Sequence, residues 1–155
     1  MFCPRFLRVA ISSLLMALSA YPAAAASDPV VLEQAKPEPL RIVYHIGDGI
    51  DQAARTIANI RNQLRISPDI RIVVVAIGPG IDFLLDGAKD KNGNPFDASV
   101  EDLARQSVGF RICGTTIDSR HIALDMILPD AQVVPSGMNE IARLELRDGY
   151  AYIRP

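Results

Sequence analysis

The apolar residues fall into two alternating patterns along the chain. Short runs rich in β-branched residues, each ended by glycine or proline, predict strands at residues 40–46, 70–77, 108–113, 131–134 and 150–153. Apolar residues spaced three or four positions apart predict helices at 51–65, 97–106, 118 to about 126, and from Ser136 onward with Met138, Ile141, Ala142 and Leu144 inward. A short apolar piece at 81–85 follows the second strand. Strands that alternate with helices at this spacing predict an α/β sandwich around a mainly parallel sheet of about five strands.

The first 26 residues have the pattern of a signal peptide. Arg5 and Arg8 precede an apolar stretch at 9–20 that is too short to span a bilayer, and alanines at 24–26 provide a small-residue cleavage site. Residues 27–39 contain three prolines among charges and are predicted to be a linker. We therefore expect an exported, periplasmic protein, soluble after cleavage, with one domain at 40–155.

The composition argues against nucleic-acid binding and against an internal disulfide. The chain has 16 basic and 18 acidic residues, and its two leader arginines are the only charges in the first 26 residues, so the mature chain is mildly acidic. Without basic runs or clustered aromatic residues, nothing favours nucleic-acid binding. Cys3 leaves with the leader, and Cys113 then has no partner for an internal disulfide.

Four segments are predicted to lie at the carboxyl ends of the strands, where parallel sheets bind ligands: 45–49, 78–80, 113–116 and 135–137. Cys113 is a potential nucleophile at this edge of the sheet. Thr115 and Asp118 are spaced as in a capped helix start, and the amides and dipole of such a start favour thiolate over thiol. The alternative is that Cys113 is a small buried apolar residue.

Other residues offer weaker candidates. His45 and His121 are secondary catalytic candidates, His45 as a base or charge partner of the thiol, although a polar surface position is the commoner role of a histidine. With Cys113 they would suit zinc or copper, but no pair has close ligand spacing, so we predict no metal site. Arg111 and Arg120 are candidates to add positive charge, with Arg111 more typical of a solvated surface.

Two loops resemble ligand-binding motifs only superficially. The segment 78–80 lacks the lysine and hydroxyl residue of a phosphate loop and is predicted to be a plain turn. The segment 90–95 has a proline where a calcium loop needs glycine, and is also predicted to be a turn. We predict no cofactor.

The segments 77–85, 92–96, 109–113 and 134–137 resemble the DsrE/DsrF-like family, in its exported branch, and the likeness extends over residues 40–155. The resemblance implies a three-layer α/β/α fold, trimers or hexamers, and the relay of sulfur as a cysteine persulfide. Cys113 stands where the relay members carry their sulfur-accepting cysteine. The best-known relay members are cytoplasmic and work with partner subunits, unlike the exported protein expected here.

We therefore predict a sulfur-relay or persulfide-carrier protein that works with a sulfur donor or acceptor protein. Cys113 is the candidate carrier, and the candidate binding positions are Gly78, Gly80, Gly114, Thr115 and Thr116. The alternative is a non-catalytic oligomeric binding or assembly protein with a buried structural cysteine. Accessibility of the thiol distinguishes the two.

Overall fold

The computed structural model describes residues 38–155. The expected signal peptide and nearly all of the expected linker lie outside the described residues. Within the described part of the chain, no helix has the length and apolar character needed to cross a membrane.

Five strands form one sheet in the order β4-β3-β2-β1-β5. Their bounds are β1 Arg41–Ile46, β2 Arg71–Ala76, β3 Gly109–Cys113, β4 Ala131–Val134 and β5 Ala151–Ile153. All four pairs are parallel; Val75, for example, pairs with His45 of β1 on one side and Arg111 of β3 on the other. The predicted parallel sheet is confirmed.

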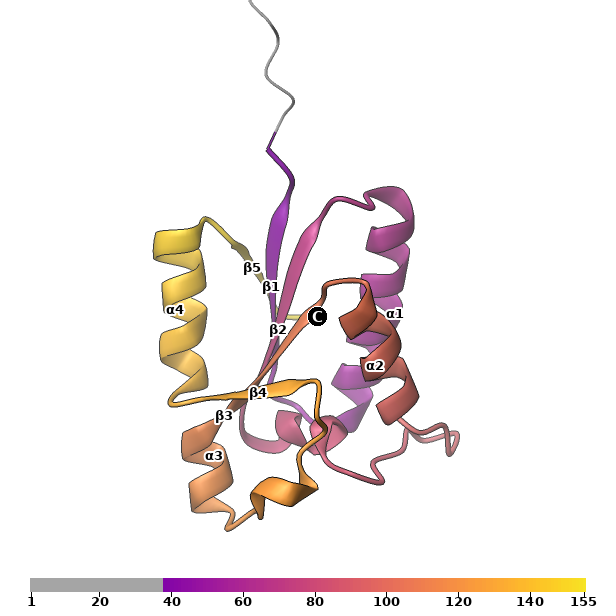
Figure 1. The fold of residues 1–155 in the computed structure, drawn as a ribbon, viewed down its shortest axis with the longest axis vertical. Coiled ribbons are helices and arrows are strands. Elements are labelled where there is room, and N and C mark those ends of the chain that lie inside the picture. The colour runs from indigo at the N-terminus through magenta and orange to yellow at the C-terminus, as the bar shows by residue number, and fades with distance from the viewer. Residues whose placement is uncertain (1–37) are drawn as a thin grey trace, which may run out of the picture. The chain divides into compact units, whose positions relative to one another are not determined.

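Helices cover both faces of the sheet. The helical segments are α1 Ile50–Ile66, η1 Gly78–Leu84, α2 Asp97–Arg105, α3 Gly114–Ser119, η2 Leu124–Met126 and α4 Gly137–Asp148, of which η1 and η2 are 3₁₀ helices. Figure 1 shows α1 and α2 on one side of the sheet and α4 on the other. This is the three-layer α/β/α sandwich that the sequence predicted.

The side-chain alternation of the strands explains the two apolar layers. Ile72 and Val74 of β2 belong to the larger layer with residues of α1 and α2, whereas Val73 and Val75 belong to a smaller layer with Ile141 and Leu144 of α4. Both faces of the central strands are therefore buried, which explains their continuous β-branched pattern.

The loops at the carboxyl edge are packed closely together. A Cβ atom added to Gly80 would lie on the carbonyl oxygen of Ile46, so only glycine fits where η1 passes the end of β1. The buried side chain of Gln52 accepts hydrogen bonds from the amides of Gly47 and Asp48, at 2.8 and 2.7 Å. This edge is thus a fixed surface on which a site can be built.

Three local predictions were wrong. The helix predicted from Asp118 to about Met126 begins instead at Gly114 and ends at Ser119, and His121 follows in a left-handed conformation with φ 52°. Met138 and Ala142, predicted to face inward on α4, are exposed. In α4 the apolar stripe is narrower than predicted: Ile141 and Leu144 pack in the layer over the sheet, where Ile77 and Tyr150 also contribute.

Candidate functional site

Cys113 is the last residue of β3 and directly precedes α3. It pairs with Val134, the last residue of the neighbouring strand β4, so the segment that leads into α4 runs alongside it. Its residue surface is 3% exposed. The thiol therefore lies just beneath the surface, between the beginnings of α3 and α4.

Two polar groups contact the sulfur directly. The amide of Gly137, the first residue of α4, donates a hydrogen bond to Sγ at 3.2 Å. The hydroxyl of Thr115 lies 3.0 Å from Sγ. Both groups can donate to a thiolate, and α4 directs the positive end of its dipole toward the sulfur.

The pKa of Cys113 results from opposing effects. Burial raises the pKa, but hydrogen bonds from Thr115, Gly137 and Thr116 lower it by more, so the pKa lies below the ordinary value of a cysteine. A lowered pKa increases the fraction of the nucleophilic thiolate near neutral pH.

Gly114 and Gly137 allow the beginnings of α3 and α4 to lie close to Cys113. A Cβ added to Gly137 would lie 2.6 Å from Cγ1 of Ile77 and 3.2 Å from Cβ of Cys113, and one added to Gly114 would lie 2.9 Å from the carbonyl oxygen of Val134. Side chains at these positions would push α3 and α4 away from the sulfur. The glycines therefore set the distance at which the amides reach it.

The turn after β2 is joined to the site through Thr116. Its buried hydroxyl accepts a hydrogen bond from the amide of Gly78 at 3.0 Å. Because that amide supplies the hydrogen, the hydroxyl proton of Thr116 is available to the sulfur, and this is one of the contacts that lower the thiol pKa. Gly78 thus supports the site without touching the thiol.

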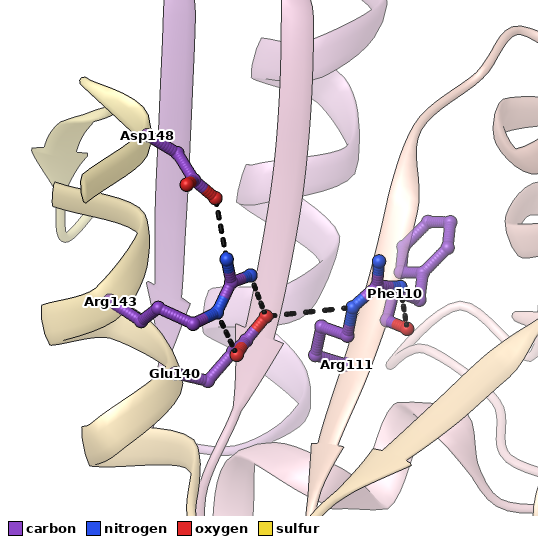
Figure 2. Close-up of polar contacts among 5 residues, drawn as sticks. All are labelled: Phe110, Arg111, Glu140, Arg143 and Asp148. Atoms are coloured by element: carbon purple, nitrogen blue, oxygen red, sulfur yellow. Dashed lines mark hydrogen bonds and ion pairs between the residues drawn. The ribbon is translucent and has the colours of Figure 1, made fainter.

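A charge network fixes α4 against β3 (Figure 2). Arg111 of β3 approaches Glu140 of α4, with Nε 3.8 Å from Oε1, and Arg143 bonds both oxygens of Glu140 at 2.8 and 2.9 Å. Arg143 also reaches Asp148. The side chain of Arg111 is 26% exposed, between a solvated and a buried position, and its charge is directed at Glu140.

The DsrE/DsrF-like family model matches residues 14–155. The chain belongs to the DsrE/DsrF-like family. No curated protein matches it.

Two solved structures resemble this DsrE/DsrF-like chain. Protein MTH1491 of unknown function from Methanobacterium thermoautotrophicum is 32% identical, with a TM-score of 0.65, over 75% of this chain and 99% of that one. The ychN protein of E. coli is 17% identical, with a TM-score of 0.55, over the same shares. The second likeness concerns the fold alone.

The structure separates the two histidines of this DsrE/DsrF-like protein from Cys113. Nδ1 of His45 lies 2.8 Å from the hydroxyl of Tyr152 in β5, and two strand spacings, about 10 Å, separate β1 from β3. Burial and the charge of Arg154 lower the pKa of His45, and Asp48 opposes them. His121 is exposed in the turn after α3. No group of metal-ligating residues occurs within residues 38–155.

The other candidate positions fall into two groups. Gly114, Thr115 and Thr116 surround the thiol, whereas Gly78 and Gly80 shape the neighbouring turn. Arg120 bonds Asp82 at 2.7 Å and the carbonyl of Gly78 at 3.3 Å.

Gly137 was not among the predicted site residues, although the segment 135–137 was predicted to lie at this edge of the sheet. The signal available was its position directly after Ser136, which caps α4 by accepting a hydrogen bond from the amide of Asn139. A glycine in the first turn of a capped helix leaves its amide accessible to an adjacent residue. That this residue is Cys113 becomes known only once β4 is placed beside β3.

Proposed function

We propose that this DsrE/DsrF-like protein is a sulfur carrier that accepts sulfane sulfur on Cys113 as a persulfide. The observation that carries the proposal is the set of donors around Sγ: the Gly137 amide at 3.2 Å and the Thr115 hydroxyl at 3.0 Å. These donors stabilise a thiolate, and they would equally stabilise the negative charge of a persulfide. Family membership supports the same chemistry.

The transfer is a thiol exchange. The Cys113 thiolate attacks the outer sulfur of a donor R–S–SH, a new S–S bond forms, and the donor S–S bond breaks. The donor leaves as R–S⁻ and takes up the proton released from Cys113. The product is a Cys113 persulfide, and no external oxidant or reductant is required.

Because Cys113 is only 3% exposed, transfer requires a local opening. The parts that cover the sulfur are the exposed side chain of Thr115 and the first turn of α4, so the proposed opening involves one of these two. Opening at this edge would leave the sheet intact, since the edge consists of loops and helix ends.

The second candidate is a non-catalytic oligomeric binding or assembly protein. The same 3% exposure favours it, because a buried thiol that never opens is chemically inert. Under this alternative the donors around Sγ serve packing only.

We also propose that the protein is exported to the periplasm and assembles into a homo-oligomer, a trimer or hexamer, that exchanges sulfur with a donor or acceptor protein. The pattern of residues 1–26 supports export. Exposed apolar side chains on and near the edge strand β4 support self-association: Leu124, Met126, Val133 and Met138. N-terminal sequencing of the mature protein and light scattering test these two points.

The test of the carrier function is the intact mass of the mature protein after treatment with a sulfane-sulfur donor. A gain of one sulfur that reductant reverses, and that Cys113→Ser abolishes, supports the carrier. Alkylation of native Cys113 provides the second measurement. Labelling only after denaturation, together with no gain of sulfur, would establish the structural alternative.

A further inference from the structure

A small open cavity lies between η1 and α3. Its volume is about 350 Å³, and it is lined by Gly78, Pro79, Asp82, Thr116, Ser119 and Arg120. Thr116 joins the cavity to the site, because it lines the cavity, lies three residues after Cys113 at the start of α3, and is one of the hydrogen-bonding groups that lower the thiol pKa. A ligand in the cavity therefore lies next to a residue of the thiol site.

The cavity carries one charge of each sign. Nη1 of Arg120 lies 2.7 Å from Oδ1 of Asp82 and donates to the carbonyl of Gly78 at 3.3 Å. Both of these contacts use Nη1, and among the described residues no hydrogen bond from Nε or Nη2 is seen, which leaves these donors for a ligand. The side chains of Arg120 and Asp82 are 40% and 35% exposed, which leaves them open to a ligand while one end of the pair is fixed.

A guanidinium beside a carboxylate is complementary to a zwitterion. A ligand carboxylate would accept from the Nε and Nη2 edge of Arg120, and a ligand ammonium would donate to the free oxygen of Asp82. An uncharged ligand would gain neither contact. The hydroxyl of Ser119 already donates to the carbonyl of Thr116, which fixes the wall nearest the sulfur.

We propose that this cavity binds the α-amino carboxylate group of a low-molecular-weight persulfide and presents its outer sulfur to Cys113. The inference rests on the proposed carrier function and assigns the donor class. Two sources share this chemistry: free cysteine persulfide, and the γ-glutamyl end of glutathione persulfide. In either case Cys113 thiolate attacks the outer sulfur, the donor S–S bond breaks, and the free thiol leaves with the proton.

The experiment measures the initial rate at which Cys113 gains one sulfur, by intact mass, against donor concentration. The three donors are cysteine persulfide, glutathione persulfide, and the persulfide of N-acetylcysteine amide, which lacks both charges. We expect a charged donor to saturate the protein and the uncharged donor to react without saturation. Saturation by cysteine persulfide alone identifies the free amino acid as the source, and saturation by glutathione persulfide identifies the γ-glutamyl end.

Two variants test the charges. Arg120→Gln and Asp82→Asn should each raise the half-saturating concentration of the charged donor about tenfold, because each removes a charged hydrogen-bonding partner. The rate with the uncharged donor, measured on the same variants, is the reference for these changes. Arg105→Gln is the matched control, since Arg105 is an exposed arginine of α2 that is paired with Glu101 at 2.6 Å, away from the cavity.

A competition experiment keeps the test independent of the variants. Alanine, a zwitterion without sulfur, should slow the charged donor in the unaltered protein, and N-acetylalanine amide should not. If Arg120→Gln behaves as the unaltered protein and alanine does not compete, while the uncharged donor still modifies Cys113, the cavity assignment is wrong and the carrier function stands. If no donor modifies Cys113, the carrier function itself is wrong.

Discussion

The hydroxyl of Thr115 is the part of the site that can be removed most cleanly. Thr115→Val replaces the hydroxyl by a methyl group of similar size, on an exposed side chain whose Oγ1 lies 3.0 Å from Sγ. Thr115→Ser keeps the hydroxyl and is the matched control. The variants therefore separate the hydrogen bond from the packing.

The expected effect follows from the energy of a hydrogen bond to a charged group. Such bonds contribute about 1.5–3 kcal/mol, and water replaces part of that at an exposed position, so we expect a loss of about 1 kcal/mol from the thiolate state. This loss raises the pKa of Cys113 and, at any pH below that pKa, reduces the thiolate fraction about fivefold.

The assay is the pH dependence of alkylation of the native protein by iodoacetamide, followed by mass. Thr115→Val should shift the profile to higher pH, and Thr115→Ser should follow the unaltered protein. Identical profiles for the valine and serine variants would refute the reasoning, because the hydroxyl would then have no electrostatic role.

Three further predictions follow from the same geometry. Gly137→Ala should lower the free energy of unfolding in urea by about 1–3 kcal/mol through overpacking and should raise the thiol pKa; an unchanged profile would contradict the amide contact. The pKa of Cys113 is lower in the folded protein than in the unfolded chain. The free energy of unfolding of the unaltered protein, compared with that of Cys113→Ser, should therefore rise with pH from the folded pKa to about 8.5 and then level off. A difference that does not change with pH would exclude a thiolate. Gly80→Ala places a Cβ atom against the backbone of Ile46 and should lower the free energy of unfolding, measured by heat or urea, by about 3 kcal/mol. Gly93 has φ 83° and open space around it, so Gly93→Ala should lower this free energy by about 1 kcal/mol. Equal losses would contradict the close packing at the edge.

Local signals explain why most elements could be predicted from the sequence. The β-branched runs of β1 and β2 are typical of buried strands. Ser136 caps the beginning of α4, and Gly149, in a left-handed conformation with φ 70°, ends it. These features depend on neighbours within a few residues. Their prediction needed no knowledge of the tertiary structure.

The start of α3 could not be predicted in the same way. Thr115 and Asp118 have the spacing of a capped helix start, yet Cys113 occupies the cap position, two residues before Thr115, and the helix begins at Gly114. The reason is tertiary: β3 ends against β4, and only glycine fits beside the carbonyl oxygen of Val134. A local pattern cannot report a constraint that a neighbouring strand imposes.

The site itself depends on the strand order. Placing β4 beside β3 brings the start of α4 to the end of β3, so that the Gly137 amide reaches the Cys113 sulfur across 24 positions of sequence. The sequence identified Cys113 and the Thr115 and Thr116 hydroxyls, which are local. It placed the second helix start, at 135–137, on the same edge, but it did not identify the Gly137 amide as a partner of the sulfur, and it placed His45 near the thiol only because both follow strands.

The same contacts that favour the thiolate also cover it. The Gly137 amide and the Thr115 hydroxyl lower the pKa of Cys113 only because they approach within 3.2 Å, and that approach leaves the residue 3% exposed. The rate of sulfur uptake by such a carrier therefore depends both on opening of the site and on ionisation of the thiol. Loosening the start of α4 would then increase access and decrease the thiolate fraction together, so the rate of sulfur uptake should pass through a maximum as this contact is weakened.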